Sequence, residues 1–425
     1  MLDIKLIREN PGEISQKIKD KGADIDLDQV LKIDEEIREL GLSVQKLREE
    51  RNKVSKEKDI EKGKEIKKEL YGKEESLKKL ETDLREQLLQ IPNAALPEVP
   101  VGDESKNEVI KKVGEPKKFN FTPKDHLELG ENLGIIDTER AAKVSGSRFA
   151  YLKGDGALLE FALIQFVLEK LGKVGFIPIV SPVLIKKDIT EELGYWHGKK
   201  EGTTNNEEYY WLNDPKENQE MYLVGTAEHA VVPMHKDEVF SVKDLPKRYI
   251  AFSSAFRREA GSYGKDTKGI IRVHQFDKLE MVSFVKPEDD KSEREKLLSI
   301  AEELVSELGL SYQIVRLASR DISFPSAETI DIETWMPSQD KYRETHSIST
   351  TTDFQARRLN IKYLPAGRQG QDGAEKKFVH ILNGTAFAIG RTIVAILENY
   401  QEEDGSVLVP EVLQKYIGKN VISPD

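Results

Sequence analysis

The sequence has 425 residues, no cysteine, a net charge of −11 and 33% charged residues, so it is long enough for two or three domains with a sizeable core. The high charge and the lack of a long apolar segment exclude a membrane-spanning protein and favour a soluble, cytoplasmic one. Because thiolates are missing and the seven histidines lack metal-ligand spacing, we expect neither disulfides nor a zinc site.

Two apolar runs with heptad spacing predict a helical hairpin over about residues 28–91. The first run comprises Val30, Ile33, Ile37, Leu40, Val44, Leu47 and Val54, and the second comprises Ile66, Leu70, Leu77, Leu80, Leu84 and Ile91. The charged stretch KEKDIEKGKE separates them and is expected to reverse the chain. Two helices of about 30 residues would form an antiparallel coiled coil roughly 45 Å long. A dimerising coiled coil is the alternative, but runs of similar length around a short polar break favour a hairpin within one chain.

Helical periodicity ends at a group of prolines and a glycine, which predicts a domain boundary near residue 110. The expected domains are therefore 1–110, with the helical hairpin, and 111–425. In the second domain, helical patterns are interspersed with β-rich runs without regular βαβ alternation, which favours an α+β fold with an antiparallel sheet. The expected helices lie at about 125–133, 157–173 and 292–308.

Residues 253–280 concentrate side chains suited to binding a nucleoside triphosphate. An apolar run from Phe252 to Phe256 ends at Arg257, and a Gly/Ser/Asp/Lys stretch leads to a second run from Ile270 to Phe284. This pattern predicts a long β-hairpin with a mobile basic loop. An arginine fork matches phosphate oxygens and an aromatic face stacks on a purine, so Arg257 and Phe276 would face one pocket. On spacing alone, a charged surface hairpin is an equal alternative. A second flexible loop is expected at 365–377, which is rich in Gly and Gln.

Four segments in order resemble class II aminoacyl-tRNA synthetases of the seryl type. FRREAG with RVHQFDKLE resembles motif 2, GFIPIVSPVLI (175–185) motif 1, GTAEHA (225–230) the serine-binding TAE loop, and LNGTAFAIGRTIVAILENYQ (382–401) motif 3. The resemblance implies a class II antiparallel sheet flanked by helices, preceded by a tRNA-binding coiled-coil arm. It also implies a homodimer that uses ATP to convert L-serine to seryl-adenylate and transfers serine to the 3′ end of tRNA(Ser) and tRNA(Sec).

The resemblance assigns roles to the charged residues of motifs 2 and 3. Arg257, Glu259 and Arg391 would be catalytic: Arg257 on the α-phosphate and the serine carboxylate, Glu259 at the nucleotide, and Arg391 stacked with Phe276 around the adenine. Arg272 would hold the γ-phosphate. The remaining ATP contacts implied are Arg258, Val273, Thr345 and His346.

A metal site is implied by YRETHSISTTTDFQARR, in which Glu344 and Ser347 match the family's Mg²⁺ ligands for ATP. Carboxylate and hydroxyl oxygens suit that hard ion. His346 and Thr350 stand where Ser and Asn are common, which affects the fine tuning of this site. We expect His346 to be hydrogen-bonded within the pocket wall rather than to act as a ligand.

Selection of serine requires hydrogen-bond partners for its ammonium and hydroxyl and no space for a larger side chain. The resemblance gives Glu280 to the ammonium. It completes the pocket with Thr226, Ala227, Glu228, Asn383 and Thr385.

The tRNA contacts are expected on the basic end of the arm. Between Lys46 and Lys79 the chain has 13 Lys/Arg against 9 Asp/Glu, although the whole protein is acidic. Basic surface is what displaces counterions from phosphates. The expected contacts are Arg51, Lys53, Lys56 and Lys58.

Two other functions remain as alternatives. A synthetase paralogue that charges a carrier protein would lack the long N-terminal arm. A non-catalytic coiled-coil scaffold would lose the charged pocket residues, which are retained together here as Arg257, Glu259, Glu280, Glu344 and Arg391.

Overall fold

The computed structural model describes residues 1–195, 208–214, 216, 219–259, 268–365 and 375–424. Its contacts divide the chain into two compact units, Met1–Ala94 and Ala95–Asp425. The sequence placed this junction near residue 110, but the intervening residues are attached to the second unit. Leu96 N–H donates to the Ala327 carbonyl at 2.9 Å, and the Pro100 carbonyl accepts from Ser319 N–H at 2.8 Å. Among the described residues, no helix has the length and apolarity needed to cross a membrane.

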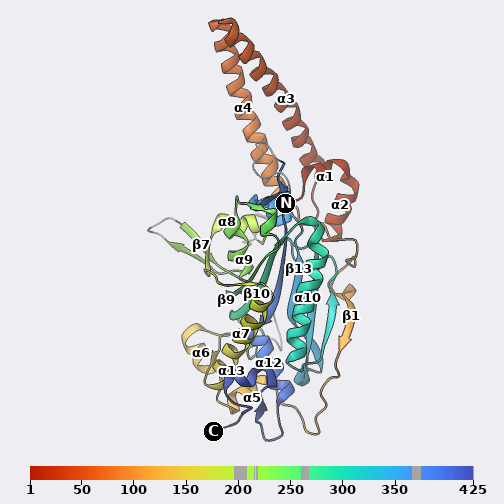
Figure 1. Ribbon diagram of the computed structural model, residues 1–425, viewed down its shortest axis with the longest axis vertical. Helices are drawn as coiled ribbons and strands as arrows, with labels where there is room; N and C mark the ends of the chain where they lie inside the picture. The colour runs from red at the N-terminus through yellow and green to blue at the C-terminus, as the bar shows by residue number, and fades with distance from the viewer. Residues whose placement is uncertain (196–207, 215, 217–218, 260–267, 366–374, 425) are drawn as a thin grey trace. The chain divides into compact units, whose positions relative to one another are not determined.

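The first unit is helical, and its two long helices form the predicted hairpin (Figure 1). Its helices are α1 (Ile4–Glu9), α2 (Pro11–Asp20), α3 (Leu27–Glu57) and α4 (Ile60–Leu89). The apolar seams meet between the long helices, where Val44, Val54 and Leu70 are buried. Lys73, which interrupts the second seam, donates to Ser43 Oγ at 2.8 Å. The polar interruption is therefore accommodated by a hydrogen bond between the helices.

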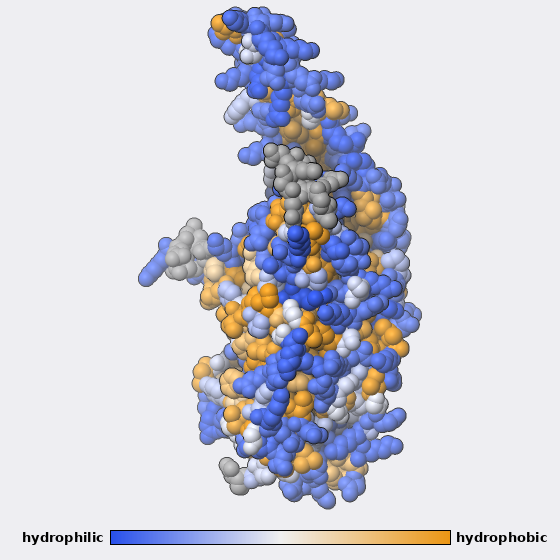
Figure 2. Space-filling model, in the orientation of Figure 1, coloured by the Kyte–Doolittle hydropathy of each residue, from blue (hydrophilic) through white to orange (hydrophobic). Residues whose placement is uncertain are grey.

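The chain reverses between α3 and α4 where the charged stretch predicted a turn. Lys58 adopts a left-handed conformation with φ 60°, and Asp59 caps α4 by accepting a hydrogen bond from Lys62 N–H at 3.1 Å. The four basic residues expected to contact tRNA lie on the last turns of α3 and at this reversal, and all are exposed. Most of the visible surface of the two helices is hydrophilic (Figure 2).

The second unit is built on an eight-stranded sheet, as the irregular alternation of helices and strands predicted. In order of pairing, its strands are β1 (Glu108–Val113), β11 (Tyr312–Arg316), β12 (Glu328–Met336), β13 (Lys341–Thr350), β16 (His380–Ala388), β10 (Gln275–Val285), β9 (Lys247–Phe256) and β4 (Ile177–Val180). Neighbouring strands are antiparallel except β4 and β9, which are parallel.

Three long helices cover one face of this sheet (Figure 1). They are α7 (Asp155–Lys173), α10 (Asp290–Glu307) and α12 (Ile389–Tyr400). Leu279 and Met281 of β10 and Ile348 of β13 point into the apolar core beneath them. Because side chains alternate along a strand, the residues between these face the opposite side. There a second apolar cluster includes Val282 and Phe284.

The remaining elements surround the sheet. The predicted helix at 125–133 is α5 (His126–Asn132), and the predicted helices at 157–173 and 292–308 correspond to α7 and α10. The other helices are α6 (Thr138–Ser145), α8 (Lys187–Leu193), α9 (Glu228–Val231), α11 (Phe354–Leu359) and α13 (Glu411–Ile417). The smaller sheets join β5 (Leu184–Lys186), β7 (Gln219–Leu223) and β6 (Trp211–Asp214); β15 (Lys377–Phe378), β14 (Lys362–Leu364) and β8 (Val239–Ser241); β17 (Val407–Leu408) and β18 (Val421–Ile422); and β2 (Ile136–Asp137) and β3 (Tyr151–Leu152).

The predicted β-hairpin is formed by β9 and β10, but its second strand begins at Gln275 rather than at Ile270. Gly269 has a left-handed φ of 71°, and the chain turns there. The hydrogen bonds between the two strands begin only at His274, whose carbonyl accepts from Arg257 N–H at 3.0 Å. The apolar residues at 270–273 line a cavity instead of continuing the strand. The predicted loop at 260–267 lies outside the described residues, as does most of the one at 365–377.

Candidate active site

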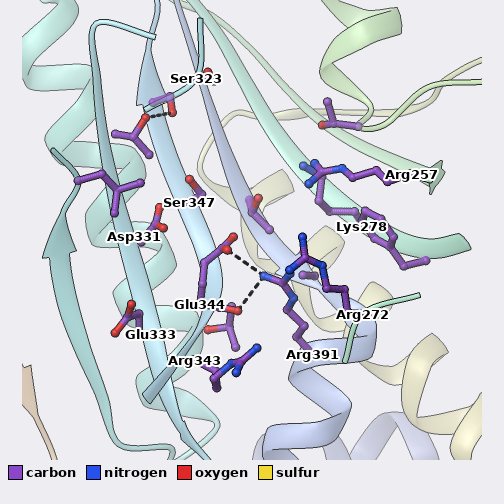
Figure 3. Close-up of a pocket in the computed structure, with 18 of the residues that line it drawn as sticks. Arg257, Arg272, Lys278, Ser323, Asp331, Glu333, Arg343, Glu344, Ser347 and Arg391 are labelled. Atoms are coloured by element: carbon purple, nitrogen blue, oxygen red, sulfur yellow. Dashed lines mark hydrogen bonds and ion pairs between the residues drawn. The ribbon is translucent and has the colours of Figure 1, made fainter. Parts of the chain in front are cut away.

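A cavity of about 850 Å³ lies on the sheet face opposite α7, α10 and α12. It is large enough for a nucleotide and a small second ligand. Arg257, Arg272, Lys278 and Arg391 lie on one side, and Asp331, Glu333 and Glu344 lie on the other, together with Arg343 (Figure 3).

Strand β10 supplies one side of the cavity through alternate residues. Phe276, Lys278 and Glu280 are two positions apart and therefore share the cavity face. Glu280 is buried, and its Oε2 lies 2.5 Å from Lys278 Nζ and accepts a hydrogen bond from Thr385 Oγ1 at 3.3 Å. A buried carboxylate thus has one ammonium and one hydroxyl as partners.

A β-bulge positions the acidic side of the cavity. Between β12 and β13 the register passes from Ile332↔His346 to Glu333↔Glu344, which leaves Thr345 as an extra residue. Glu344 and Ser347 are three positions apart, yet the bulge lets both face the cavity beside Glu333 and Asp331. A second register shift, at Ala386 between β10 and β16, in the same way brings both Thr385 and Ala388 to the cavity.

Arg391, in the first turn of α12, connects the two sides. Its Nη1 lies 3.0 Å from Glu344 Oε2 and donates to the Glu344 carbonyl at 3.0 Å, while its Nε donates to the Ile271 carbonyl at 3.3 Å (Figure 3). Desolvation within the cavity would raise the pKa of Glu344, but the positive charges of Arg391, Arg257 and Lys278 together hold that pKa below its usual value. Arg272 forms a similar ion pair with Glu259.

Arg257 is held by contacts of two kinds. Its Nε donates to the Gly225 carbonyl at 3.2 Å, and its guanidinium carbon lies 5.5 Å from the centroid of the Phe276 ring. Arg257 and Phe276 therefore line one pocket, as the hairpin pattern predicted.

Beyond Glu280, the cavity ends in a buried polar group around the TAE segment. Glu228 is 2% exposed and accepts hydrogen bonds from Tyr195 Oη at 2.9 Å and Gln355 Nε2 at 2.8 Å. Burial raises the pKa of Glu228 to about 7. The rings of Tyr195 and Tyr209 flank His229, with centroids 4.5 and 5.6 Å away. Burial lowers the pKa of His229 well below its usual value, which keeps this ring neutral.

The acidic side has an oxygen atom available for a cation. Asp331 is buried, and its Oδ1 has no hydrogen-bond partner among the described residues. Burial and the charge of Glu344 raise the pKa of Asp331 well above its usual value. The nearby donors on Asp331, Glu344 and Ser347 are all oxygens, which fits Mg²⁺. Within the described parts of the chain, no three His, Cys, Asp or Glu side chains make up a metal site by themselves.

The structure brings most of the predicted site residues together. Those lining the cavity are Thr226, Glu228, Arg257, Glu259, Arg272, Val273, Phe276, Glu280, Glu344, Thr345, Ser347, Asn383, Thr385 and Arg391. Three others do not line it. Ala227 is buried in the neighbouring apolar cluster, and Arg258 is exposed. His346 is buried and hydrogen-bonded to Thr345 Oγ1 at 2.8 Å, and burial lowers its pKa to about 3.

Several lining residues were not among those predicted. Lys278 could have been found from the sequence, because it lies two positions from both Phe276 and Glu280 on one strand, and Asp331 likewise lies two positions from Glu333. Tyr195 and Tyr209 carried none, since they come from segments outside the four motifs.

The comparisons with known proteins agree with this geometry. Residues 1–95 match the family model for the seryl-tRNA synthetase N-terminal domain, and residues 210–400 match that for the tRNA synthetase class II core domain (G, H, P, S and T). The serine–tRNA ligase of Thermodesulfovibrio yellowstonii is 43% identical, over 99% of this chain and 100% of the relative. That of Geobacillus kaustophilus is 41% identical over 98% and 99%.

Two solved structures are similar over their whole length. Seryl-tRNA synthetase from Pyrococcus horikoshii, complexed with ATP, has a TM-score of 0.88 and 39% identity and covers 100% of both chains. The cytoplasmic serine–tRNA ligase from Naegleria fowleri, complexed with AMP, has a TM-score of 0.87 and 32% identity and covers 100% of this chain and 99% of its own. On the strength of both domain matches and of full-length relatives above 40% identity, the chain belongs to the seryl-tRNA synthetase family.

Proposed function

We propose that this chain is a serine–tRNA ligase that activates L-serine with ATP and transfers it to tRNA(Ser). The family relationship supports the activity, and relatives in complexes with ATP and AMP support the nucleotide. One observation carries the site: the cavity places a buried carboxylate with a neighbouring hydroxyl, Glu280 with Thr385, on the same sheet face as a group of arginines.

Activation requires the serine carboxylate to attack the α-phosphorus of ATP, which brings two anions together. Positioning and preorganised positive charge lower that barrier. Arg257 would contact the α-phosphate and the serine carboxylate, and Arg272 the γ-phosphate. Phe276 and Arg391 offer the adenine an aromatic face and a guanidinium plane, both of which stack well on a base. Release of pyrophosphate leaves seryl-adenylate. The 3′-hydroxyl of the terminal tRNA adenosine then attacks its carbonyl carbon, the bond from that carbon to the phosphate oxygen breaks, and AMP leaves with the proton released to solvent, so no enzyme nucleophile is needed.

Glu344 and Ser347 would hold Mg²⁺ together with ATP, and Asp331 lies beside them. When bound, the ion would offset the negative charge of the phosphates. Since the oxygen donors on these strands do not make a complete site, the phosphates would supply the remaining ligands.

Serine would bind at the Glu280 end of the cavity, with its ammonium on Glu280. Thr226 and Glu228 lie nearby, and Asn383 Nδ2 is a buried donor without a hydrogen-bond partner among the described residues. Tyr195 and Tyr209 line the same end and restrict its size. A site with fixed polar partners rejects analogues that leave those partners unpaired.

The helical hairpin would bind tRNA through the exposed basic residues Arg51, Lys53, Lys56 and Lys58. Proteins recognise RNA helices chiefly through shape and backbone, and such contacts weaken with salt. We assign tRNA binding to the first unit, Met1–Ala94, and catalysis to the second, Ala95–Asp425. Recognition of a long variable arm would extend to tRNA(Sec). The enzyme would act in the cytoplasm, where charged tRNA is used.

We also propose a homodimer. The edge strand β4 exposes Ile177 (50%) and Val180 (83%), and the adjacent helix α7 exposes Leu158 (46%) and Phe161 (59%). Motif 1, which contains β4, is the subunit interface in the family that this chain resembles. Burial of these four side chains in a second copy would remove exposed apolar surface from water.

The proposed activity predicts ATP–pyrophosphate exchange that requires serine and Mg²⁺. Arg257→Ala should lower kcat/KM by roughly 10² or more, because it removes charge held in place for the transition state. Arg357→Ala is the matched control: Arg357 also stacks on a phenylalanine, at 4.6 Å from Phe378, but lies outside the cavity. Exchange with another amino acid and none with serine would refute the proposed function. An unchanged rate for Arg257→Ala would refute only its role.

Light scattering at micromolar concentration should give the mass of two chains. Phe161→Asp should shift the protein towards one chain, since it places a charge in the proposed interface. Ile110→Asp, on an exposed residue of the opposite edge strand β1, should leave the mass unchanged. A monomeric wild-type protein with full charging activity would contradict the homodimer.

Replacing residues 30–91 by a short linker should leave serine-dependent exchange largely intact and abolish charging of tRNA. Every cavity residue lies after residue 103, so the adenylate site does not draw on the hairpin. Charge reversal of Arg51, Lys53, Lys56 and Lys58 together should weaken tRNA binding and reduce its salt dependence while leaving both units folded. If both variants charge tRNA at the normal rate, the hairpin has another role.

A further inference from the structure

Glu280 contacts the same two chemical groups that serine presents. One is an ammonium, Lys278 Nζ, at 2.5 Å from Oε2, and the other is a hydroxyl, Thr385 Oγ1, at 3.3 Å from the same oxygen. Both Lys278 and Glu280 are buried and line the cavity. Serine carries an ammonium and a hydroxyl on adjacent carbons, so it presents to a carboxylate the same two groups.

We propose that Lys278 is an internal competitor of the substrate: its ammonium occupies the position on Glu280 that the serine ammonium takes, and serine binding displaces it. The proposal rests on the proposed function, since it requires serine to bind at Glu280. It gives Lys278, which lies in motif 2 but had no assigned role, a part in positioning Glu280 and in selecting ligands that carry an ammonium.

The physical reason is the cost of a buried carboxylate without a partner. Removing both water and counter-charge from an anion is expensive, so Glu280 requires a cation whether or not serine is present. Lys278 reaches the carboxylate from the same strand face, two residues away, because alternate side chains of β10 point into the cavity. A ligand without an ammonium cannot replace this partner, and it therefore gains nothing from Glu280.

The displaced ammonium has a place to go. Lys278 lies among Arg257, Arg272 and Arg391 (Figure 3), and its charge acts on both Glu228 and Glu344. A flexible four-carbon chain lets Nζ turn from Glu280 towards these carboxylates or towards the substrate's anionic groups. Displacement thus moves one positive charge within the cavity and leaves none unpaired.

Competition has a measurable consequence. If Lys278 holds Glu280 in most molecules, the apparent serine Kd is the intrinsic one divided by the fraction of molecules in which Glu280 is available. Lys278→Met removes the competitor with little change of volume. We expect calorimetry to show that this variant binds serine about three- to tenfold tighter than the wild type. Lys278→Arg, which restores a cation on Glu280, should return the serine Kd to the wild-type value or above it.

Arg248→Met is the matched control, because it also breaks an ion pair between a cation of the sheet and a buried carboxylate. Arg248 Nη2 and Glu293 Oε2 lie 2.5 Å apart on β9 and α10, and neither residue lines the cavity. This variant should unfold at a lower temperature but keep the serine Kd. A merely structural role for Lys278 would instead weaken serine binding as the protein loosens.

A second measurement does not depend on a variant. In a crystal structure of the wild-type enzyme with serine, Lys278 Nζ should lie beyond hydrogen-bond distance from Glu280, with the substrate ammonium in its place. Equal or weaker serine binding by a folded Lys278→Met variant would overturn the inference, as would a Lys278–Glu280 pair retained beside bound serine. If the wild-type protein neither binds serine nor exchanges pyrophosphate with it, the proposed function itself fails.

Discussion

Three ion pairs balance charges that line the cavity, and the rest of the site depends on them. Arg272 pairs with Glu259, Lys278 with Glu280, and Arg391 with Glu344. Only Lys278 and Glu280 are both buried, and a buried charge that loses its partner costs about 3–5 kcal/mol. Arg272, Arg391 and Glu344 are partly exposed to the cavity, so solvent screens the loss of their partners. Serine and ATP bring an ammonium, a carboxylate and phosphates, and each can exchange with a group already in a pair. Binding then proceeds by exchange of partners.

The sheet makes this arrangement possible because side chains alternate between its two faces, and because two β-bulges interrupt that alternation. Phe276, Lys278 and Glu280 face the cavity by simple alternation along β10. The bulges at Thr345 and Ala386 add one residue each, so that side chains three positions apart share the cavity face. Oxygen donors thereby gather on β12 and β13, where Lys341 and Arg343 also line the cavity, while Arg257, Arg272, Lys278 and Arg391 come from the motif 2 hairpin and α12. Arg391 and Glu344 form an ion pair between these two groups.

The sequence predicted the elements whose signals are local. Heptad spacing gave the two long helices, and Lys73 within the second seam was tolerated because Ser43 on the other helix accepts its hydrogen bond. The start of β10 was predicted wrongly at Ile270, because an apolar run does not reveal that Gly269 turns the chain and that the next residues line a cavity.

The candidate site could be predicted only where motifs cover it. Resemblance identified the charged residues, but the bulge at Thr345 is invisible in a pattern of residue types. Tyr195 reaches Glu228 across 33 positions, a contact that depends on tertiary packing. The pairing of Lys278 with Glu280 depends on side-chain conformation, whereas spacing shows only that the two side chains share a strand face.

The division of charge across the cavity is tested most directly by the affinity for ATP with and without Mg²⁺. In the wild type, Mg²⁺ should tighten ATP binding strongly, because the acidic strands hold the ion and the basic side holds the phosphates. In Glu344→Gln, most of this Mg²⁺-dependent gain in ATP affinity should be lost. The affinity for ATP with Mg²⁺ should fall by roughly 10- to 100-fold, as for other changes at metal sites. Its affinity for ATP alone should be equal or higher, because Arg391 is then released to the nucleotide. A Glu344→Gln variant with the full wild-type Mg²⁺ increment would contradict the account.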